Sequence, residues 1–261
     1  MAHNKLVTKI TLAMKVAVVL LLLLAVSSAL ESRVVGGDFV SIKKFPHSVF
    51  LHCLCDEAES ICGASVLNQM ILLTAGHCMY DCKGKWAVQA YAGNEHLEKM
   101  STMRTVQKYT IHRKYNPRTF ENDISLVLLS KQLTLGANVK RVIVRNKVPD
   151  VKDVQVAGWG TVDEETEELA VKLKCVKQTL QSKQYCKELT AREDALCAKN
   201  SATQHPSRGD SGSALVTTNG EQIGLVSFRY SQRPELVVYT NIPSYKTWIT
   251  VNSYNLDCNR K

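Results

Sequence analysis

Three separated segments of this sequence carry side chains that could act together in nucleophilic catalysis. Ser211 lies in the stretch RGDSGS, residues 208–213, directly after an aspartate. A serine hydroxyl is a weak nucleophile near neutral pH, so it needs a nearby base and a group that orients this base. His77, at the end of an apolar run, and Asp123, at the start of another, supply these two side chains. The three residues therefore predict an activated serine nucleophile.

The order of these segments resembles that of the chymotrypsin-like (trypsin-like, S1 family) serine proteases. His77 lies in the motif LTAGHC, and Asp123 in ENDISLVLL. Further motifs follow the order of the family, namely SRVVGG at 32–37, AGWGT at 157–161, LVSF at 225–228 and VYT at 238–240. One such motif is weak, but all of them together, spanning residue 34 to the end, are specific. The chain is identified as a member of this family.

The strand pattern agrees with the fold that the resemblance implies, which is all-β, with two packed six-stranded antiparallel β-barrels, divided near residue 140, and a C-terminal helix. Short apolar or alternating runs separated by polar turns are typical of such a protein. These runs cover residues 45–54, 64–74, 86–91, 124–129, 154–157, 214–217 and 222–227, and the tail 243–255 is helical in pattern. The catalytic residues are expected in the cleft between the barrels.

The first 33 residues differ from the rest and predict export. Lys9 and Lys15 precede eleven apolar residues, 16–26, and small residues follow. Since about 20 apolar residues are needed to span a bilayer, a cleaved signal peptide over 1–29 is favoured over a membrane anchor. A short propeptide, 30–33, and a protease domain, 34–261, follow. Met14 is an alternative start.

The resemblance also implies a zymogen. Cleavage after Arg33 by an activating protease would release the amino group of Val34. The carboxylate of Asp210 is expected to be buried and so to need a cation, and the new amine supplies one. Activity of the catalytic cleft should therefore depend on this cleavage.

The catalytic roles follow from the matched positions. His77 takes the proton of Ser211 and returns it to the leaving amine, while Asp123 orients the imidazole. The backbone N–H groups of Gly209 and Ser211 form the oxyanion hole. Ser227 hydrogen-bonds near the triad, and its backbone pairs with an extended substrate.

The residues expected around the substrate pocket depart from those common in the family. Ser207 replaces a cysteine, and no partner cysteine lies between Ser227 and Tyr239. His205 is placed at the pocket floor, where trypsin-like members carry Asp, and Arg229 and Val237 at the walls. A site without a carboxylate does not pair a substrate Lys or Arg, so we predict non-tryptic specificity. Small apolar residues are slightly favoured over acidic ones, which Arg229 could pair only if it points inward.

Nine cysteines are compatible with an oxidising compartment. The resemblance implies the bridges Cys62–Cys78 and Cys186–Cys197. Cys82 is expected to pair with Cys53 or Cys55, and the pairing of Cys175 and Cys258 stays open. Because the total is odd, at least one cysteine is unpaired within the chain.

The resemblance implies a secreted, extracellular monomer that acts on proteins or peptides and is open to protein inhibitors. Residues 1–33 hold four of the 33 basic and one of the 24 acidic residues, so the remainder has a formal net charge of +6. The basic residues are scattered, and neither nucleic-acid binding nor membrane binding is predicted. No cofactor is expected and no metal site, because His96 and His112 lack a convincing ligand spacing.

One alternative to an enzyme remains. A serine protease homologue can keep the fold and act as a non-catalytic binding or regulatory module. The retained His77, Asp123 and Ser211 favour catalysis, whereas the altered pocket residues keep this alternative open.

Overall fold

The computed structural model describes residues 37–56, 58–82, 86–100, 102–163, 165–200 and 204–258. The predicted signal peptide and propeptide, together with Arg33 and Val34, lie outside the described residues. Within these ranges, no helix has the length and apolar character required to cross a membrane.

The first barrel contains six antiparallel strands and is closed. They are β2 (Ser48–Cys55), β3 (Ala58–Val66), β4 (Ile71–Thr74), β5 (Trp86–Ala92), β6 (Thr102–Ile111) and β7 (Ser125–Leu129). Their order around the barrel is β2-β3-β4-β7-β6-β5, and β5 pairs with β2 to complete the ring. Alternate side chains point inward and fill the barrel, among them the fully buried Leu51, Val66, Leu72 and Val88.

The second barrel is built in the same way from the rest of the chain. Its strands are β9 (Asp153–Gly158), β10 (Lys174–Leu180), β11 (Ala195–Lys199), β12 (Ala214–Thr217), β13 (Glu221–Arg229) and β14 (Leu236–Asn241). Strand β9 pairs with both β10 and β12, which closes the ring. Two short strands extend it, since β1 (Asp38–Phe39) pairs with β10 and β8 (Ile143–Val144) with β13. The predicted fold class is confirmed.

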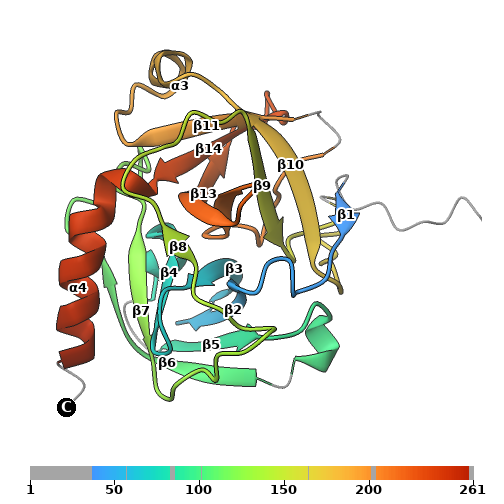
Figure 1. Cartoon of the computed structure of the whole chain (residues 1–261), viewed down its shortest axis with the longest axis vertical. Helices are drawn as coiled ribbons and strands as arrows, with labels where there is room; N and C mark the ends of the chain where they lie inside the picture. Colours follow the sequence, from blue (N-terminus) through green and yellow to red (C-terminus); the bar gives the residue numbers. More distant parts are fainter. Residues whose placement is uncertain are drawn as a thin grey trace, which may run out of the picture. The chain divides into compact units, whose positions relative to one another are not determined.

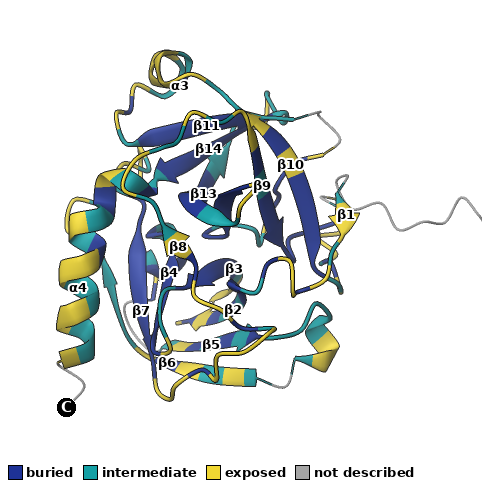
Figure 2. Cartoon of the chain, viewed as in Figure 1, coloured by how far each residue is buried: buried dark blue, intermediate teal, exposed yellow. Residues whose placement is uncertain are grey.

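Buried apolar side chains join the two barrels. One cluster combines Leu73 of β4, Leu126 of β7 and Leu225 of β13 with Ile242 and Ile249. Ile242 belongs to the 3₁₀ helix η2 (Ile242–Tyr245), and Ile249 to α4 (Lys246–Cys258), which lies along β7 in Figure 1. Figure 2 shows buried strands around both barrels and a largely exposed outer face of α4. This packing fixes the cleft between the barrels.

The structure divides one predicted strand and adds elements that the sequence pattern missed. Residues 64–74 form parts of β3 and β4, because Asn68 makes the turn between them. The Asn68 side-chain oxygen accepts hydrogen bonds from the N–H groups of Met70 and Ile71, both at 2.8 Å. The elements not predicted from the sequence pattern include β6, β10 and β11 and the helices α2 (His77–Tyr80), η1 (Leu97–Lys99) and α3 (Lys183–Thr190).

Three disulfides join elements of the described chain. Both bridges implied by the resemblance, Cys62–Cys78 and Cys186–Cys197, are present, and Cys82 pairs with Cys55. Among the described cysteines, Cys53 and Cys175 are buried free thiols and Cys258 is an exposed one. Burial raises the pKa of Cys53 to about 12 and that of Cys175 to about 11, so both thiols stay protonated and unreactive near neutral pH.

Candidate active site

The pairing of β4 with β7 brings His77 and Asp123 together. Thr74 at the end of β4 lies opposite Ser125 at the start of β7, so the residues just outside these ends meet. The His77 ring Nδ1 lies 2.9 Å from Asp123 Oδ2, and the backbone N–H of His77 donates to Oδ1 at 2.8 Å. Gly76 permits this approach, because a Cβ there would lie only 3.2 Å from Asp123 Oδ1.

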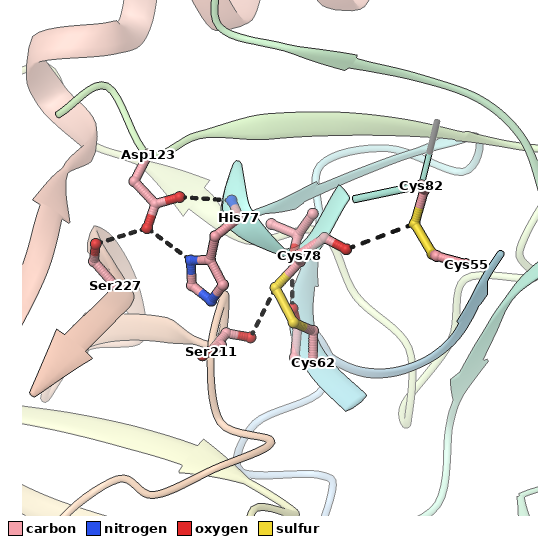
Figure 3. Close-up of a disulfide and its surroundings, with 10 residues drawn as sticks. Cys55, Cys62, His77, Cys78, Cys82, Asp123, Ser211 and Ser227 are labelled. Carbon is pink, nitrogen blue, oxygen red and sulfur yellow. Dashed lines mark hydrogen bonds and ion pairs between the residues drawn. A yellow bond between two sulfur atoms is a disulfide. The ribbon is translucent and has the colours of Figure 1, made fainter. Parts of the chain in front are cut away.

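Asp123 is fully buried, and donors from three elements surround it. Its Oδ2 also accepts a hydrogen bond from the Ser227 hydroxyl of β13 at 2.6 Å. Its backbone carbonyl accepts one from the hydroxyl of Thr240 in β14 at 2.8 Å. A buried carboxylate requires such partners. Figure 3 shows the Asp123 carboxylate between the His77 ring and Ser227, so the second barrel helps to hold the aspartate of the first.

The surroundings of His77 make its ring a stronger base. Burial of the ring opposes its protonation, but the charge of Asp123, the hydrogen bond to it and the charge of Asp81 outweigh burial and raise the pKa of His77 above 6.5. Asp81 follows α2, and the His77 side chain keeps 23 % of its surface exposed. This ring is therefore suited to accept a proton from a group in the cleft.

A pH profile checks this electrostatic arrangement. General base catalysis requires the neutral ring, so kcat/KM should rise with pH through the pKa of His77, which is raised from the ordinary histidine value of 6.5. Replacing Asp81 by Asn removes one charge that raises this pKa and should move the acid limb to lower pH. Added salt should reduce that shift by screening. The control variant is Glu98→Gln, because Glu98 is exposed and does not contribute to the pKa of His77. The same pH dependence of kcat/KM in Asp81→Asn and Glu98→Gln would contradict the role of Asp81.

Backbone contacts fix Ser211 between the barrels, in the turn before β12. Its carbonyl accepts a hydrogen bond from Gly63 N–H of β3 at 2.7 Å, and the next N–H, of Gly212, donates to Val226 O of β13 at 2.8 Å. Gly212 has φ +78°, and a Cβ there would collide with Thr74. In Figure 3, Ser211 and Asp123 lie on opposite sides of the His77 ring. Across the described ranges, no hydrogen bond joins the Ser211 hydroxyl to this ring, a common situation in proteins without substrate.

The turn before Ser211 leaves two N–H groups available. The carbonyls of Ser207 and Arg208 accept hydrogen bonds from Asp210 and Thr161 N–H, at 3.0 and 2.7 Å, which fixes the course of the turn. Gly209 adopts φ +88°, a conformation suited to glycine. The N–H groups of Gly209 and Ser211 have no acceptor in the part of the chain that the structure describes. Two neighbouring free donors of this kind can stabilise a developing oxyanion.

The Asp210 side chain points away from Ser211 into the second barrel. Its carboxylate accepts hydrogen bonds from the N–H groups of Gly160 and Ser207, both at 2.9 Å. A Cβ on Gly158 or Gly160 would collide with it. Burial raises the pKa of Asp210 to about 6, against the two hydrogen bonds that lower it. No described basic side chain forms an ion pair with this carboxylate, and Val34 lies outside the described residues.

The cavity on one side of Ser211 contains three of the four predicted pocket residues. It has a volume of about 420 Å³, and Ser227, Arg229 and Val237 line it together with Arg208 and the aromatic ring of Phe228. No carboxylate is among its described lining residues. The cavity thus combines apolar walls with two cationic side chains.

The structure does not bring His205 to this cavity, although the sequence analysis placed it at the floor. His205 is 4 % exposed and lines a small internal cavity beside Asp210, with its Nδ1 3.2 Å from the carbonyl of Pro206. The next two residues, Pro206 and Ser207, line the 420 Å³ cavity instead. The Ser207 hydroxyl lies 2.8 Å from that of Thr161.

A second cavity, of about 500 Å³, opens on the other side of His77 and Ser211. The Cys55–Cys82 disulfide and Ile61 form part of its wall, and Glu59 and Asp81 lie at its edge. An extended chain could therefore lie across both cavities and place one of its carbonyl groups at Ser211.

Comparison with known proteins assigns the family. The family model described as Trypsin matches residues 34–249, most of the chain. The chain belongs to the trypsin family. This trypsin-family chain is 29 % identical to Hypodermin-B of Hypoderma lineatum over 235 residues, covering 86 % of this chain and 89 % of that protein. It is 28 % identical to Trypsin alpha of Drosophila melanogaster over 237 residues, covering 86 % and 90 %.

Two solved structures share the fold of this chain. The structure of HL collagenase at 1.7 Å resolution matches with a TM-score of 0.74 at 23 % identity, covering 84 % of this chain and 98 % of that one. Neuropsin, a serine protease expressed in the limbic system of mouse brain, matches with a TM-score of 0.71 at 28 % identity, covering 83 % and 98 %. The trypsin-family assignment thus rests on sequence and on structure, and it makes protein substrates the expected class.

Proposed function

We propose that this protein is a secreted serine endopeptidase that hydrolyses peptide bonds through His77, Asp123 and Ser211. The observation that carries the proposal is the hydrogen-bonded set of His77, Asp123 and Ser227 beside Ser211, in a cleft with two free backbone donors. Hydrolysis of a peptide library by the protein cut after Arg33, with loss of hydrolysis on serine-directed inhibition, tests it.

The reaction follows the chemistry of these groups. The neutral His77 ring accepts the Ser211 proton as the serine oxygen attacks the peptide carbonyl carbon, and Asp123 stabilises the charged ring. The carbonyl oxygen becomes negative and is stabilised by the N–H groups of Gly209 and Ser211, each worth about 3 kcal/mol in the transition state. His77 then protonates the leaving amine, and water hydrolyses the acyl-enzyme by the same steps in reverse.

We infer that the protein is made as a zymogen. The Asp210 carboxylate has its pKa raised by burial, so its charged form is unfavourable until a cation arrives. The amine of Val34, freed by cleavage after Arg33, is the cation that the sequence offers. Export to an oxidising compartment is supported by the apolar run 16–26 and by the three disulfides.

The second candidate function is a non-catalytic homologue that binds partners in the same cleft. The observation that favours it is the altered pocket, in which Arg208 and Arg229 line the cavity and Ser207 replaces a bridging cysteine. This candidate predicts tight binding of peptides without turnover. Absence of both covalent labelling and hydrolysis in the cut protein would support it over the enzyme.

The cleaved residue should not be Lys or Arg. A substrate cation in the 420 Å³ cavity would meet Arg229 and, among the described lining residues, no carboxylate, whereas the other lining arginine, Arg208, is paired with Glu167. A charge left unpaired in this way is rejected, so we expect cleavage after Lys or Arg to be at least about tenfold slower than after small apolar residues.

Profiling of the cut enzyme with a peptide library measures this preference. The variant Arg229→Ala removes one cation and should relax the rejection of Lys and Arg, with a loss of any cleavage after acidic residues. The variant Arg233→Ala, at a surface ion pair with Glu235, serves as control. Dominant cleavage after Lys or Arg by the unmodified enzyme would refute the proposed specificity.

A further inference from the structure

The Cys186–Cys197 disulfide closes a loop that carries a buried ion pair outside the catalytic set. In this loop, between α3 and β11, Arg192 donates from Nε to Asp194 Oδ1 at 2.9 Å and from Nη2 to Oδ2 at 3.0 Å. The Arg192 side chain is 2 % exposed and that of Asp194 18 %. Desolvation of two charges is costly, so a pair of this kind needs good geometry and additional hydrogen bonds.

The additional hydrogen bonds come from the segment that leads to Asp123. Asp194 Oδ2 accepts one from the backbone N–H of Asn122 at 2.9 Å and lies 2.6 Å from the hydroxyl of Tyr245 in η2. That hydroxyl is also 3.1 Å from Asn122 Oδ1. Asn122 has φ +56°, a left-handed conformation that Asn adopts more readily than most residues, and the hydrogen bond from its N–H to Asp194 helps to hold it there. Asp194 therefore fixes the residue directly before Asp123.

The same ion pair contacts the aromatic side chains that cover His77. The Arg192 guanidinium lies 5.9 Å from the ring centre of Phe228, and this ring lies 5.3 Å from that of Phe120. Phe120 meets the His77 ring edge-on at 5.7 Å and, like Asn122, has a left-handed φ, of +55°. The loop that carries Arg192 and Asp194 thus supports both members of the pair, Asp123 through Asn122 and His77 through Phe120.

We propose that the Arg192–Asp194 pair is a positioning element, which holds residues 120–122 so that Asp123 and the His77 ring keep their productive orientation. This inference rests on the proposed function for its effect on rate, whereas its effect on geometry holds for either candidate function. Neither residue lines the two cavities beside Ser211. Both therefore act through Asp123 and His77 and do not contact substrate.

Neutral replacement of the whole pair tests the proposal. The double variant Arg192→Leu/Asp194→Leu removes both charges together and every acceptor for Asn122 N–H. Buried ion pairs often tolerate apolar replacement, so this variant should fold. We expect kcat/KM to fall about 10²-fold, mainly in kcat, because small misplacements of catalytic groups have effects of this size. The control is Glu193→Gln in the same loop, whose carboxylate is exposed and pairs with Lys187 on the surface.

The pKa of the His77 ring, measured by NMR, gives a readout that needs no turnover. It should fall in the double variant, because a displaced Asp123 no longer stabilises the charged ring, while Asp81 remains in place. His112, whose ring packs 5.4 Å from that of Tyr245 and whose pKa is sensitive to Asp194, must be assigned separately. If Asp194 acted on His77 only through its charge, the pKa of His77 would change in the single variant Asp194→Leu. It would then return to its original value in the double variant, in which both charges are removed.

These results separate the two proposals. An unchanged pKa of His77 and an unchanged kcat in a folded double variant would overturn the positioning role and leave the protease function intact. A lowered pKa of His77 in a chain that never hydrolyses peptides would support the positioning role and overturn the protease function. If the double variant does not fold, Tyr245→Phe provides a second test, because it removes one hydroxyl that contacts Asp194. It should lower the pKa of His77 and kcat by less than the double variant. A Tyr245→Phe protein with the same pKa of His77 and the same kcat as the unmodified chain would overturn the proposal.

Discussion

Replacing Ser211 by alanine is expected to lower kcat by about 10⁶-fold, the size of effect that follows loss of the nucleophile from a catalytic triad. The variant should fold normally, because the contacts that hold this turn use the backbone of Ser211 and not its hydroxyl. Peptide hydrolysis by the protein cut after Arg33, followed with a fluorogenic substrate of the preferred sequence, measures the loss.

A matched control is available two residues further on. The variant Ser213→Ala also removes one hydroxyl from the same stretch, but Ser213 is buried and does not line the two cavities beside His77. It should retain most of the activity. Equal activity of Ser211→Ala and the unmodified protein would assign the hydrolysis to another group or to a contaminant.

The uncut chain is expected to hydrolyse peptides about 10² to 10³ times more slowly than the cut chain, the effect of losing one oxyanion donor. Without the Val34 amine, the buried Asp210 lacks a cationic partner among the described residues, and the adjoining turn of Gly209 and Ser211 loses an anchor. Arg33→Ala should block activation, and Asp210→Asn should leave a chain that is cut normally but has a similar defect.

The pH dependence of stability gives a second readout for Asp210. In the uncut chain the folded-state pKa of about 6 exceeds the ordinary aspartate value of 3.8, so the contribution of this group to stability is present below pH 4 and lost as pH rises through 6. Pairing with the new amine should lower the pKa and remove this loss. Thermal unfolding of Arg33→Ala and of the cut chain between pH 4 and 7 measures how the stability of each changes with pH.

Full peptidase activity in Arg33→Ala, verified uncut by mass spectrometry, would refute the zymogen proposal.

Strands that are apolar along their length were predictable from the sequence. Strands that depend on pairing with neighbouring strands were not. Strands such as β4 and β7 are continuous apolar runs that are buried on both faces. By contrast, β6 (TMRTVQKYTI) and β10 (KCVKQTL) carry many polar residues, which in β10 include the buried Lys174 and Gln178. Their strand conformation comes from pairing with neighbours that are distant in sequence, which a local pattern does not contain.

The grouping of His77, Asp123 and Ser211 was predictable because each of them lies in a local motif, whereas the residues that support this group were not predictable. His205 shows the limit of counting residues from the nucleophile, since it lines the small cavity beside Asp210 and not the cavity beside Ser211. The roles of Asp194 and Phe120 depend on contacts between segments far apart in the sequence. The nearest sequence signal for Asp194 was its place beside Arg192 in a loop bracketed by two cysteines.

Reaction of the cut protein with a fluorophosphonate, followed by peptide mapping, tests the central proposal most directly. The proposal predicts one covalent adduct, on Ser211, that forms faster as pH rises through the pKa of His77 and is absent in Ser211→Ala. The reagent needs only an activated serine and no knowledge of the preferred peptide. A fully cut, folded protein that gives no adduct, or an adduct on a residue other than Ser211, would contradict it.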